Sequence, residues 1–152
     1  MIDIRKFKEG DEEALWSVFY SSIHQVCSGD YSNEQIDAWA PKDIDPSIWI
    51  NKFRSIKPFV ATLEGNVVGY ADLQCDGEID HFFVHGDHQG KGVGTGLMEK
   101  IIDSAGSKEK LFSEVSHTAK PFFEKYGFKV IRKQNVNMRG VTLSNNVMER
   151  RN

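Results

Sequence analysis

The chain has few of the residues that stabilise small secreted proteins or that span membranes. Two cysteines occur among its 152 residues, Cys27 and Cys75, and we expect both to be buried free thiols. Two cysteines exclude a disulfide-rich scaffold and a cysteine-based zinc ribbon. The longest apolar runs, such as residues 58–63, are far shorter than the roughly 20 residues that a membrane helix needs. We therefore expect no membrane-spanning segment.

Runs of basic residues are also missing. The net charge is −3, with 11 Lys/Arg against 20 Asp/Glu in residues 1–119 and 8 against 2 in residues 120–152. This distribution lacks the concentrated basic surface of nucleic-acid-binding proteins, so we expect no nucleic-acid partner. The first eight residues lack the apolar stretch and cleavage site of a secretory signal, which predicts a cytoplasmic protein.

Length and apolar periodicity predict one domain over residues 1–152, of mixed α+β class. We expect strands at residues 2–7, 59–63, 67–73, 79–84, 111–116, 128–136 and 141–148, and helices at residues 11–27, 32–40, 46–53, 93–105 and 119–126. The strands over residues 58–84 should form an antiparallel meander. Residues 80–116 should form a strand–helix–strand unit with a right-handed crossover and parallel strands.

A glycine-rich loop precedes the helix at residues 93–105. Residues 89–96 have the sequence Gln-Gly-Lys-Gly-Val-Gly-Thr-Gly. Unpaired amides at a helix N-terminus attract anions, and glycine lets the backbone approach a pyrophosphate. The spacing fits neither a P-loop nor the G-x-G-x-x-G motif, so neither ATP nor NAD is favoured. The alternative is a structural turn that binds nothing.

Two segments resemble the GCN5-related N-acetyltransferases. The segment from Gln89 to Gly94 matches the family's acyl-CoA loop, Arg/Gln-x-x-Gly-x-Gly/Ala. The segment from Ala119 to Phe128 is similar to the family's Ala-x-x-Phe-Tyr-x-x-x-Gly-Phe. The spacing between the two and the order of strands also agree, so the resemblance covers essentially the whole chain.

This resemblance implies a GNAT-like fold and an acetyl-CoA site. The fold is a central, mostly antiparallel, twisted sheet of about seven strands with one splayed parallel pair, residues 79–84 and 111–116, flanked by four to five helices. Backbone groups of Phe82, Phe83 and Val84 are expected to pair with the pantetheine arm. The pyrophosphate is expected on the amides of Gln89, Gly90, Lys91, Gly92, Val93, Gly94 and Thr95. Lys91 either adds a point charge to a phosphate or is simply solvated.

The sequence departs from the family pattern at two positions. Gly86 stands where a proline is common, which loosens the entry to the loop. Phe123 stands where many members have the tyrosine that protonates the leaving thiolate, and a phenyl ring cannot donate a proton. Tyr126, three residues further on, is the best substitute acid, and its alternative role is that of a packing aromatic.

Transfer to an amine also needs a proton acceptor, because an alkyl amine with a pKa near 10.4 is only about one part in a thousand neutral at pH 7. Strand alternation predicts that only one of Asp80 and His81 faces the substrate. Glu78 lies two residues before Asp80, so both side chains are expected on the same face of the strand, and we favour this face as the catalytic one. The alternative is that the two carboxylates are only solvated by water. We place His81 among the substrate-binding residues. A metal site of His81, His85 and His88 is disfavoured, and we expect no metal.

The acceptor is expected between the first helix and the second strand. In relatives this region roofs the acceptor site, and here it contains Tyr31, Trp39 and Trp49 among acidic residues that attract a cationic amine. The alternative is that the two tryptophans only pack short helices onto the core.

The sequence thus predicts an acetyl-CoA-dependent N-acetyltransferase that acts on the primary amine of a small molecule by direct attack in a ternary complex. One alternative is a protein or peptide acetyltransferase, which needs an open groove. Another is a non-catalytic acyl-CoA-binding module, which Phe123 keeps open. A homodimer is compatible with the sequence.

Overall fold

The computed structural model describes all 152 residues and contains two β-sheets. The first sheet has four antiparallel strands in the order β1 (Ile2–Lys6), β2 (Phe59–Leu63), β3 (Asn66–Ala71) and β4 (Phe82–Val84). The turn between β2 and β3 contains Glu64 and Gly65, both with positive φ. The predicted antiparallel meander is confirmed.

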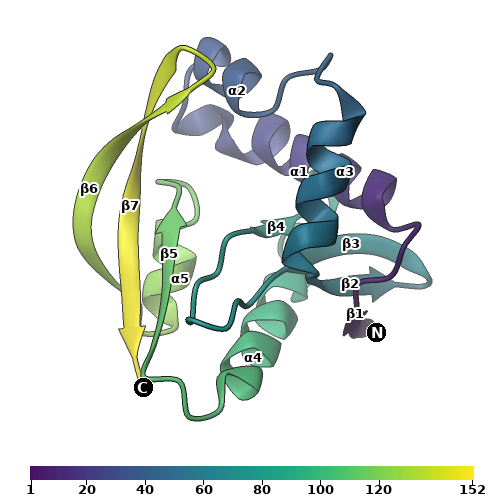
Figure 1. The fold of residues 1–152 in the computed structure, drawn as a ribbon, viewed down its shortest axis with the longest axis vertical. Helices are drawn as coiled ribbons and strands as arrows, with labels where there is room; N and C mark the ends of the chain where they lie inside the picture. Colours follow the sequence, from purple (N-terminus) through teal and green to yellow (C-terminus); the bar gives the residue numbers. More distant parts are fainter.

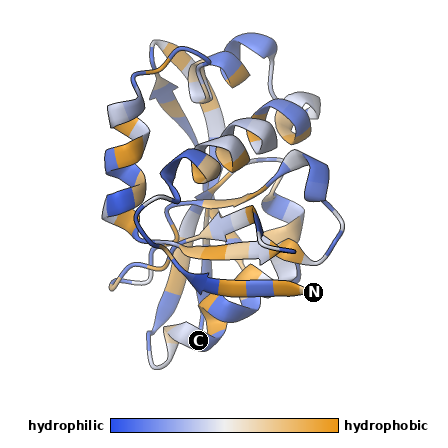
Figure 2. Ribbon diagram, turned by 90° about the vertical axis from the view of Figure 1, so that its right-hand side faces the viewer, coloured by the Kyte–Doolittle hydropathy of each residue, from blue (hydrophilic) through white to orange (hydrophobic).

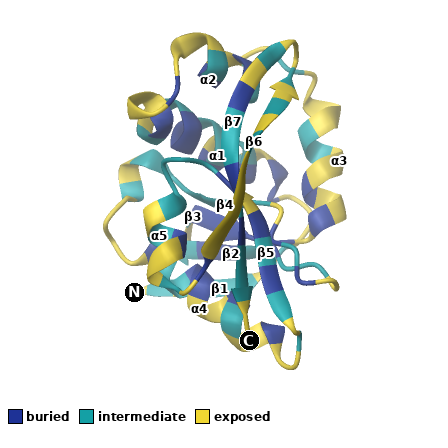
Figure 3. Cartoon of the chain, turned by 90° about the vertical axis from the view of Figure 1, so that its left-hand side faces the viewer, coloured by how far each residue is buried: buried dark blue, intermediate teal, exposed yellow.

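The second sheet has three antiparallel strands in the order β5, β7, β6. Their bounds are Lys110–Val115 for β5, Lys129–Met138 for β6 and Val141–Arg151 for β7. The β6–β7 hairpin turns at Arg139 and Gly140, which have positive φ. Strand β6 forms the outer edge and is the most exposed strand of this sheet (Figure 3). Both strands of the hairpin extend further than their sequence pattern predicts.

A short parallel bridge between Glu78 and Phe112 joins the two sheets. The Ile79 amide donates to the Phe112 carbonyl at 2.8 Å, and the Phe112 amide donates to the Gly77 carbonyl at 3.1 Å. After this bridge β4 stays with the first sheet and β5 stays with the second, so the two strands diverge (Figure 1). The predicted seven-stranded fold with one splayed parallel pair is confirmed.

The strand predicted at residues 79–84 begins later than expected, at Phe82. Residues 78 and 79 are bonded to the second sheet instead. The His81 amide donates to the Asp72 side chain at 2.6 Å, so a carboxylate replaces the regular strand partner there. Regular alternation of side chains therefore does not apply to residues 78–81.

Five α-helices and two 3₁₀ turns surround the sheets. Their bounds are α1 (Glu12–Val26), η1 (Cys27–Gly29), α2 (Asn33–Trp39), α3 (Pro46–Ile56), η2 (Gly86–His88), α4 (Val93–Ala105) and α5 (Lys120–Lys125). None of these helices is both long and apolar enough to cross a membrane. Helix α1 contacts β3, β4 and α3, whereas α4 contacts all four strands of the first sheet.

The first sheet separates two apolar clusters because its side chains alternate between faces. Val60 and Tyr70 pack in one cluster with residues of α1 and α3. Ala61 and Ala71 pack in the other with the buried stripe of α4. Apolar residues accordingly concentrate in the strands, while polar residues alternate with them along the outer helices (Figure 2). Cys27 is buried as expected, but Cys75 is exposed, because it lies in the turn before the bridge.

Gly69 in β3 allows α4 to approach the sheet closely. A Cβ at this position would lie 2.7 Å from Val93 Cγ1 and 3.1 Å from the Phe83 carbonyl oxygen. Both contacts are shorter than ordinary van der Waals contact, and the second involves a backbone atom that cannot rotate away. The lack of a Cβ atom at Gly69 thus determines how closely the start of α4, and the glycine loop before it, can lie to the sheet.

We expect Gly69→Ala to lower the free energy of unfolding by about 1–3 kcal/mol, because overpacking shifts α4 or β4. Gly29→Ala is the matched control, since no atom lies within 4 Å of its added Cβ and its φ is not positive. The control should stay within about 0.5 kcal/mol of the parent. Urea denaturation of the three proteins measures this, and equal stability of Gly69→Ala and the parent would contradict the close approach.

Candidate active site

Two cavities open where the sheets diverge. The larger one, of about 510 Å³, lies between α1, α2 and α3 on one side and β5 and the β6–β7 hairpin on the other. The smaller one, of about 300 Å³, lies between β4, the glycine loop and α5. Phe83 and Ser116 line both cavities. A ligand in one cavity therefore meets a ligand in the other at these two residues.

The glycine loop lines the smaller cavity with unpaired amides. Gly90 and Gly92 have φ values of +73° and +84°, which only glycine adopts without strain. Gly92 is the N-cap of α4, and the first backbone hydrogen bond of the helix is donated by Gly96. The amides of residues 90–95 donate to no protein group. The loop therefore presents free donors and the positive end of a helix dipole to this cavity.

One edge of β4 also faces the smaller cavity. The pairing of β4 with β3 uses the backbone groups of His81, Phe83 and His85. In an antiparallel pair the intervening residues point the other way, so Phe82 and Val84 direct their amides and carbonyls away from β3. The Gln89 side chain donates to the Val84 carbonyl at 2.9 Å, which ties the loop to the strand.

These features fit the group that the sequence predicts. An anion-binding loop and a free strand edge lie in one cavity, which suits a ligand that has a pyrophosphate at one end and an arm of amide groups at the other. Of the predicted cofactor residues, Lys91 alone does not line this cavity or the larger one, and its Nζ lies 3.4 Å from His88 Nδ1.

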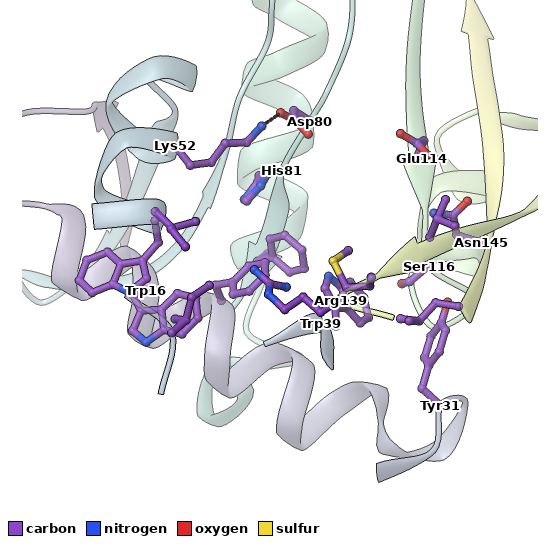
Figure 4. A pocket seen from close by; sticks show the side chains of 18 of the residues that line it. Trp16, Tyr31, Trp39, Lys52, Asp80, His81, Glu114, Ser116, Arg139 and Asn145 are labelled. Carbon is purple, nitrogen blue, oxygen red and sulfur yellow. Dashed lines mark hydrogen bonds and ion pairs between the residues drawn. The ribbon is translucent and has the colours of Figure 1, made fainter. Parts of the chain in front are cut away.

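The larger cavity contains Asp80 and His81 together (Figure 4). Strand alternation does not separate the two residues, because both precede the regular strand β4. Asp80 forms an ion pair with Lys52 of α3, with 2.5 Å between Oδ2 and Nζ. The cavity thus has a carboxylate paired with a lysine at the point where the chain enters β4.

His81 is held in one tautomer by Tyr70. The hydroxyl of Tyr70, which is fully buried, lies 2.9 Å from His81 Nδ1 and has no other partner. A buried hydroxyl donates its proton where an acceptor is present, so we assign Nδ1 as the acceptor and place the ring proton on Nε2. Burial lowers the pKa of His81 to about 4, although the charge of Asp80 opposes this shift. His81 is therefore a neutral hydrogen-bond donor at pH 7.

Asp72 completes this buried network behind the cavity. It is fully buried and accepts hydrogen bonds from the His81 amide at 2.6 Å and from Gln74 Nε2 at 2.7 Å. Burial raises the pKa of Asp72 to about 6, and its hydrogen bonds offset part of that shift. Burial thus favours the neutral forms of both Asp72, behind the cavity, and His81, in its wall.

The opposite wall comes from β5 and β7. Ser116 follows β5, and its Oγ accepts a hydrogen bond from the Ala119 amide at 3.0 Å while its own proton is donated to no protein group. Tyr31 donates to the Ser144 carbonyl at 2.8 Å and accepts from the His117 amide at 3.1 Å. Ser116 therefore has a free donor at the junction of the cavities, whereas the Tyr31 hydroxyl is fully used by the fold.

Two predicted catalytic residues lie outside both cavities. Glu78 is occupied in the bridge between the sheets, and partial burial together with the charges of Asp80, Asp76 and Glu114 raises its pKa. Tyr126 ends α5 and packs its ring against Phe122, with 5.2 Å between centroids. The structure therefore does not bring Glu78 or Tyr126 to the site, because one turns toward β5 and the other caps a helix.

The predicted acceptor residues Tyr31, Trp39, Trp49 and His81 all line the larger cavity. Sequence reasoning missed Trp16, Ser116, Arg139 and Asn145, which also line it (Figure 4). Ser116 had one available signal, because it lies directly after a predicted strand and three residues before the Ala119 segment. No set of three or more His, Cys, Asp or Glu side chains is arranged to hold a metal ion.

The opposite pKa shifts of Asp72 and His81 predict two effects of pH on stability that partly cancel. The pKa of Asp72 is raised from 3.8 to about 6, so ionisation of this buried carboxyl lowers the free energy of unfolding as pH rises through this range. The pKa of His81 is lowered from 6.5 to about 4, so protonation of this buried ring lowers the free energy of unfolding as pH falls through its range. The two effects oppose each other in the parent. Asp72→Asn removes the first, so its stability relative to the parent should increase by up to about 3 kcal/mol between pH 4 and pH 6.5.

Urea denaturation at half-unit pH steps measures this difference. Asp103→Asn, at an exposed position of α4, is the control and should follow the parent curve. A constant difference between Asp72→Asn and the parent over this pH range would contradict the raised pKa of Asp72.

Comparison with known proteins identifies the family. A family model described as an acetyltransferase (GNAT) domain matches residues 27–150. The uncharacterized N-acetyltransferase YafP of Escherichia coli (strain K12) is 35% identical over 144 residues, which cover 95% of this chain and 92% of YafP.

Solved structures agree with this assignment. A GCN5-related N-acetyltransferase from Rhodopseudomonas palustris has a TM-score of 0.93 at 31% identity, over 98% of this chain and 94% of that chain. The PaiA N-acetyltransferase from Thermoplasma acidophilum, solved in complex with coenzyme A, shares the fold with a TM-score of 0.73 at 22% identity, over 100% of this chain and 99% of that chain. This chain belongs to the GCN5-related N-acetyltransferase family of acetyl-CoA-dependent acetyltransferases.

Proposed function

We propose that this protein transfers the acetyl group of acetyl-CoA directly to the primary amine of a small molecule, within a ternary complex. The observation that carries the proposal is the junction of the two cavities at Phe83 and Ser116. The smaller cavity fits acetyl-CoA, which supplies the thioester, and the larger one has room for an acceptor beside it. No covalent enzyme intermediate is needed when both substrates meet at one point.

A small acceptor is favoured over a protein chain because the two sides of the larger cavity are tied together. Helices α2 and α3 line one side, and the Arg139 guanidinium reaches from the β6–β7 turn to donate to the Ala38 carbonyl at 2.8 Å. A peptide would need an open groove along which an extended chain can lie. A protein that only binds acyl-CoA would need the smaller cavity but not the larger one.

Asp80 is our candidate for the proton acceptor. The ammonium form of the amine first passes a proton to Asp80, directly or through one water. The neutral nitrogen then bonds to the thioester carbon, the carbon–sulfur bond breaks, and the second proton lost by the nitrogen leaves to solvent. The assigned tautomer of His81 places a proton on Nε2, so His81 acts as a hydrogen-bond donor to the acceptor molecule and not as the base. Ser116 donates a hydrogen bond to the departing thiolate, which solvent then protonates.

Thermal unfolding with acetyl-CoA, followed by CoA release with a panel of small amines and lysine peptides, tests the proposal. We expect acetyl-CoA to raise the Tm of the parent and small amines, but not peptides, to release CoA. Gly92→Glu should abolish the rise in Tm, because it places a carboxylate against the pyrophosphate. Gly92→Ala is the matched control for strain at a φ of +84° and should keep most of the affinity.

An unchanged affinity of Gly92→Glu for acetyl-CoA would overturn the placement of the loop. Release of CoA by lysine peptides alone would replace the small-molecule acceptor with a protein. A rise in Tm with no release by any amine would favour the binding module.

The pH dependence of turnover separates the roles of Asp80 and Ser116. Asp80→Asn should lower kcat at least tenfold at pH 7, and the deficit should shrink as pH approaches the pKa of the amine, where a proton acceptor is no longer needed. Ser116→Ala should lower kcat by a factor that stays constant with pH and leave acetyl-CoA affinity unchanged. A pH-independent deficit in Asp80→Asn would contradict its role as the proton acceptor.

A further inference from the structure

The charged side chains of the larger cavity are unequally paired. Four of them line it, and the ion pair between Lys52 and Asp80 neutralises two. Glu114 of β5 accepts a hydrogen bond from Gln134 and has no cationic partner within ion-pair distance. Arg139 donates to the Ala38 carbonyl and has no carboxylate partner. One exposed carboxylate and one exposed guanidinium, each without an ionic partner, therefore line the same cavity.

A buried acceptor atom marks the anionic side. Asn145 Oδ1 is inaccessible to solvent and has no hydrogen-bond partner. Leaving a buried acceptor unmet costs about 1–3 kcal/mol, and a modest turn of this side chain toward the cavity would let the N–H donor of a ligand meet it. Asn145 lies beside Ser116, because the register of β5 and β7 pairs Val115 with Asn146. Figure 4 shows Asn145, Ser116 and Glu114 on the same wall.

This wall is where the reacting amine must lie. Ser116 also lines the smaller cavity, so a donor held by Asn145 lies next to the acetyl group. An amine has N–H donors to give to Asn145 Oδ1, and the unpaired carboxylate of Glu114 attracts its cationic form on entry. The electrostatics and the geometry of group transfer thus place the amine at the same end of the cavity.

The other polar residues of the cavity, Arg139 and His81, offer hydrogen-bond donors that suit an anionic group. Arg139 presents guanidinium N–H groups that no carboxylate occupies, and its planar fork matches a carboxylate. His81 adds a neutral Nε2–H donor from the opposite wall. Between these polar groups the lining is apolar and aromatic, with the rings of Trp16 and Trp49 stacked 5.5 Å apart.

On the basis of the function proposed above, we propose that the acceptor is a zwitterion: a primary amine with an apolar or aromatic body and a carboxylate or similar anionic group. Asn145 and Glu114 hold the amine beside Ser116, and Arg139 holds the anionic group. This class includes hydrophobic amino acids and amino-substituted aromatic acids. It disfavours simple alkyl and arylalkyl amines and the lysine side chains of proteins, because these leave Arg139 unpaired.

Two matched pairs of acceptors test this inference. Phenylalanine and phenethylamine differ by one carboxylate close to the amine, whereas 4-(aminomethyl)benzoate and benzylamine differ by one carboxylate far from it. In at least one pair we expect kcat/KM for the carboxylate-bearing member to exceed that of its partner at least tenfold. Arg139→Gln should abolish this preference, and Arg139→Lys should retain part of it.

Arg132→Gln is the control, because Arg132 is exposed on β6 and does not line the cavity, and it should keep the full preference. Glutamine at position 139 still has a donor for the Ala38 carbonyl, and an unchanged Tm would confirm that the variant is folded. Equal or better turnover of both carboxylate-free amines overturns the inference, as does a preference that survives Arg139→Gln or the failure of all four probes to react. Each of these outcomes leaves the rise in Tm with acetyl-CoA intact, whereas loss of that rise in the parent overturns the proposed function itself.

Discussion

The hydrogen bonds that join residues 77–79 to residues 111–113 are the constraint on which the site depends. They include the backbone pair of the bridge and a 2.6 Å bond from Ser113 Oγ to the Ile79 carbonyl. A Cβ on Gly77 would lie 2.2 Å from the Lys110 carbonyl oxygen, so only glycine lets the two segments approach this closely. Because the sheets are fixed at this end and diverge beyond it, one edge of β4 is left without a strand partner.

A free strand edge inside a protein is unfavourable unless a ligand or solvent satisfies its polar groups. In the complex that we propose, the smaller cavity would use this edge for binding, since an arm with amide groups can pair with Phe82 and Val84 as a strand would. The same divergence creates the larger cavity, whose two walls belong to different sheets. Both cavities thus result from the divergence of the two sheets, and Phe83 and Ser116 line both of them.

The buried network behind the larger cavity sets its charge. If His81 were protonated, its positive charge would repel the ammonium form of an incoming amine, and the proton of the Tyr70 hydroxyl would lose its acceptor. Burial and the hydrogen bond from Tyr70 to Nδ1 together favour the neutral ring. His81 therefore adds no positive charge to the cavity, which leaves Glu114 as the lining carboxylate without a cationic partner.

The sequence predicted those parts of the molecule that short-range patterns determine. The hairpin of β2 and β3, the glycine loop with α4 behind it and the splayed strand pair follow from periodicity, turn residues and the family resemblance. The parity argument for residues 78–81 failed because it assumed a continuous strand, whereas residues 78 and 79 pair with β5. Asn145 and Arg139 carried no local signal, because they reach the cavity only through the long-range pairing of β5, β7 and β6.

The replacement of the family's tyrosine by Phe123 can be understood from the proton balance of the reaction. Phe123 is 2% exposed and packs against Phe82 and Phe128, with ring centroids 5.5 Å and 5.0 Å away, so a hydroxyl there would need a buried partner. A thiol has a pKa near 8.5, so its thiolate is a weak base that a hydrogen bond from Ser116 can stabilise until solvent protonates it. An alkyl amine with a pKa near 10.4 holds its proton much more tightly. Removing that proton is therefore the more demanding step of the proposed reaction, which agrees with a carboxylate at Asp80 and no phenolic acid at position 123.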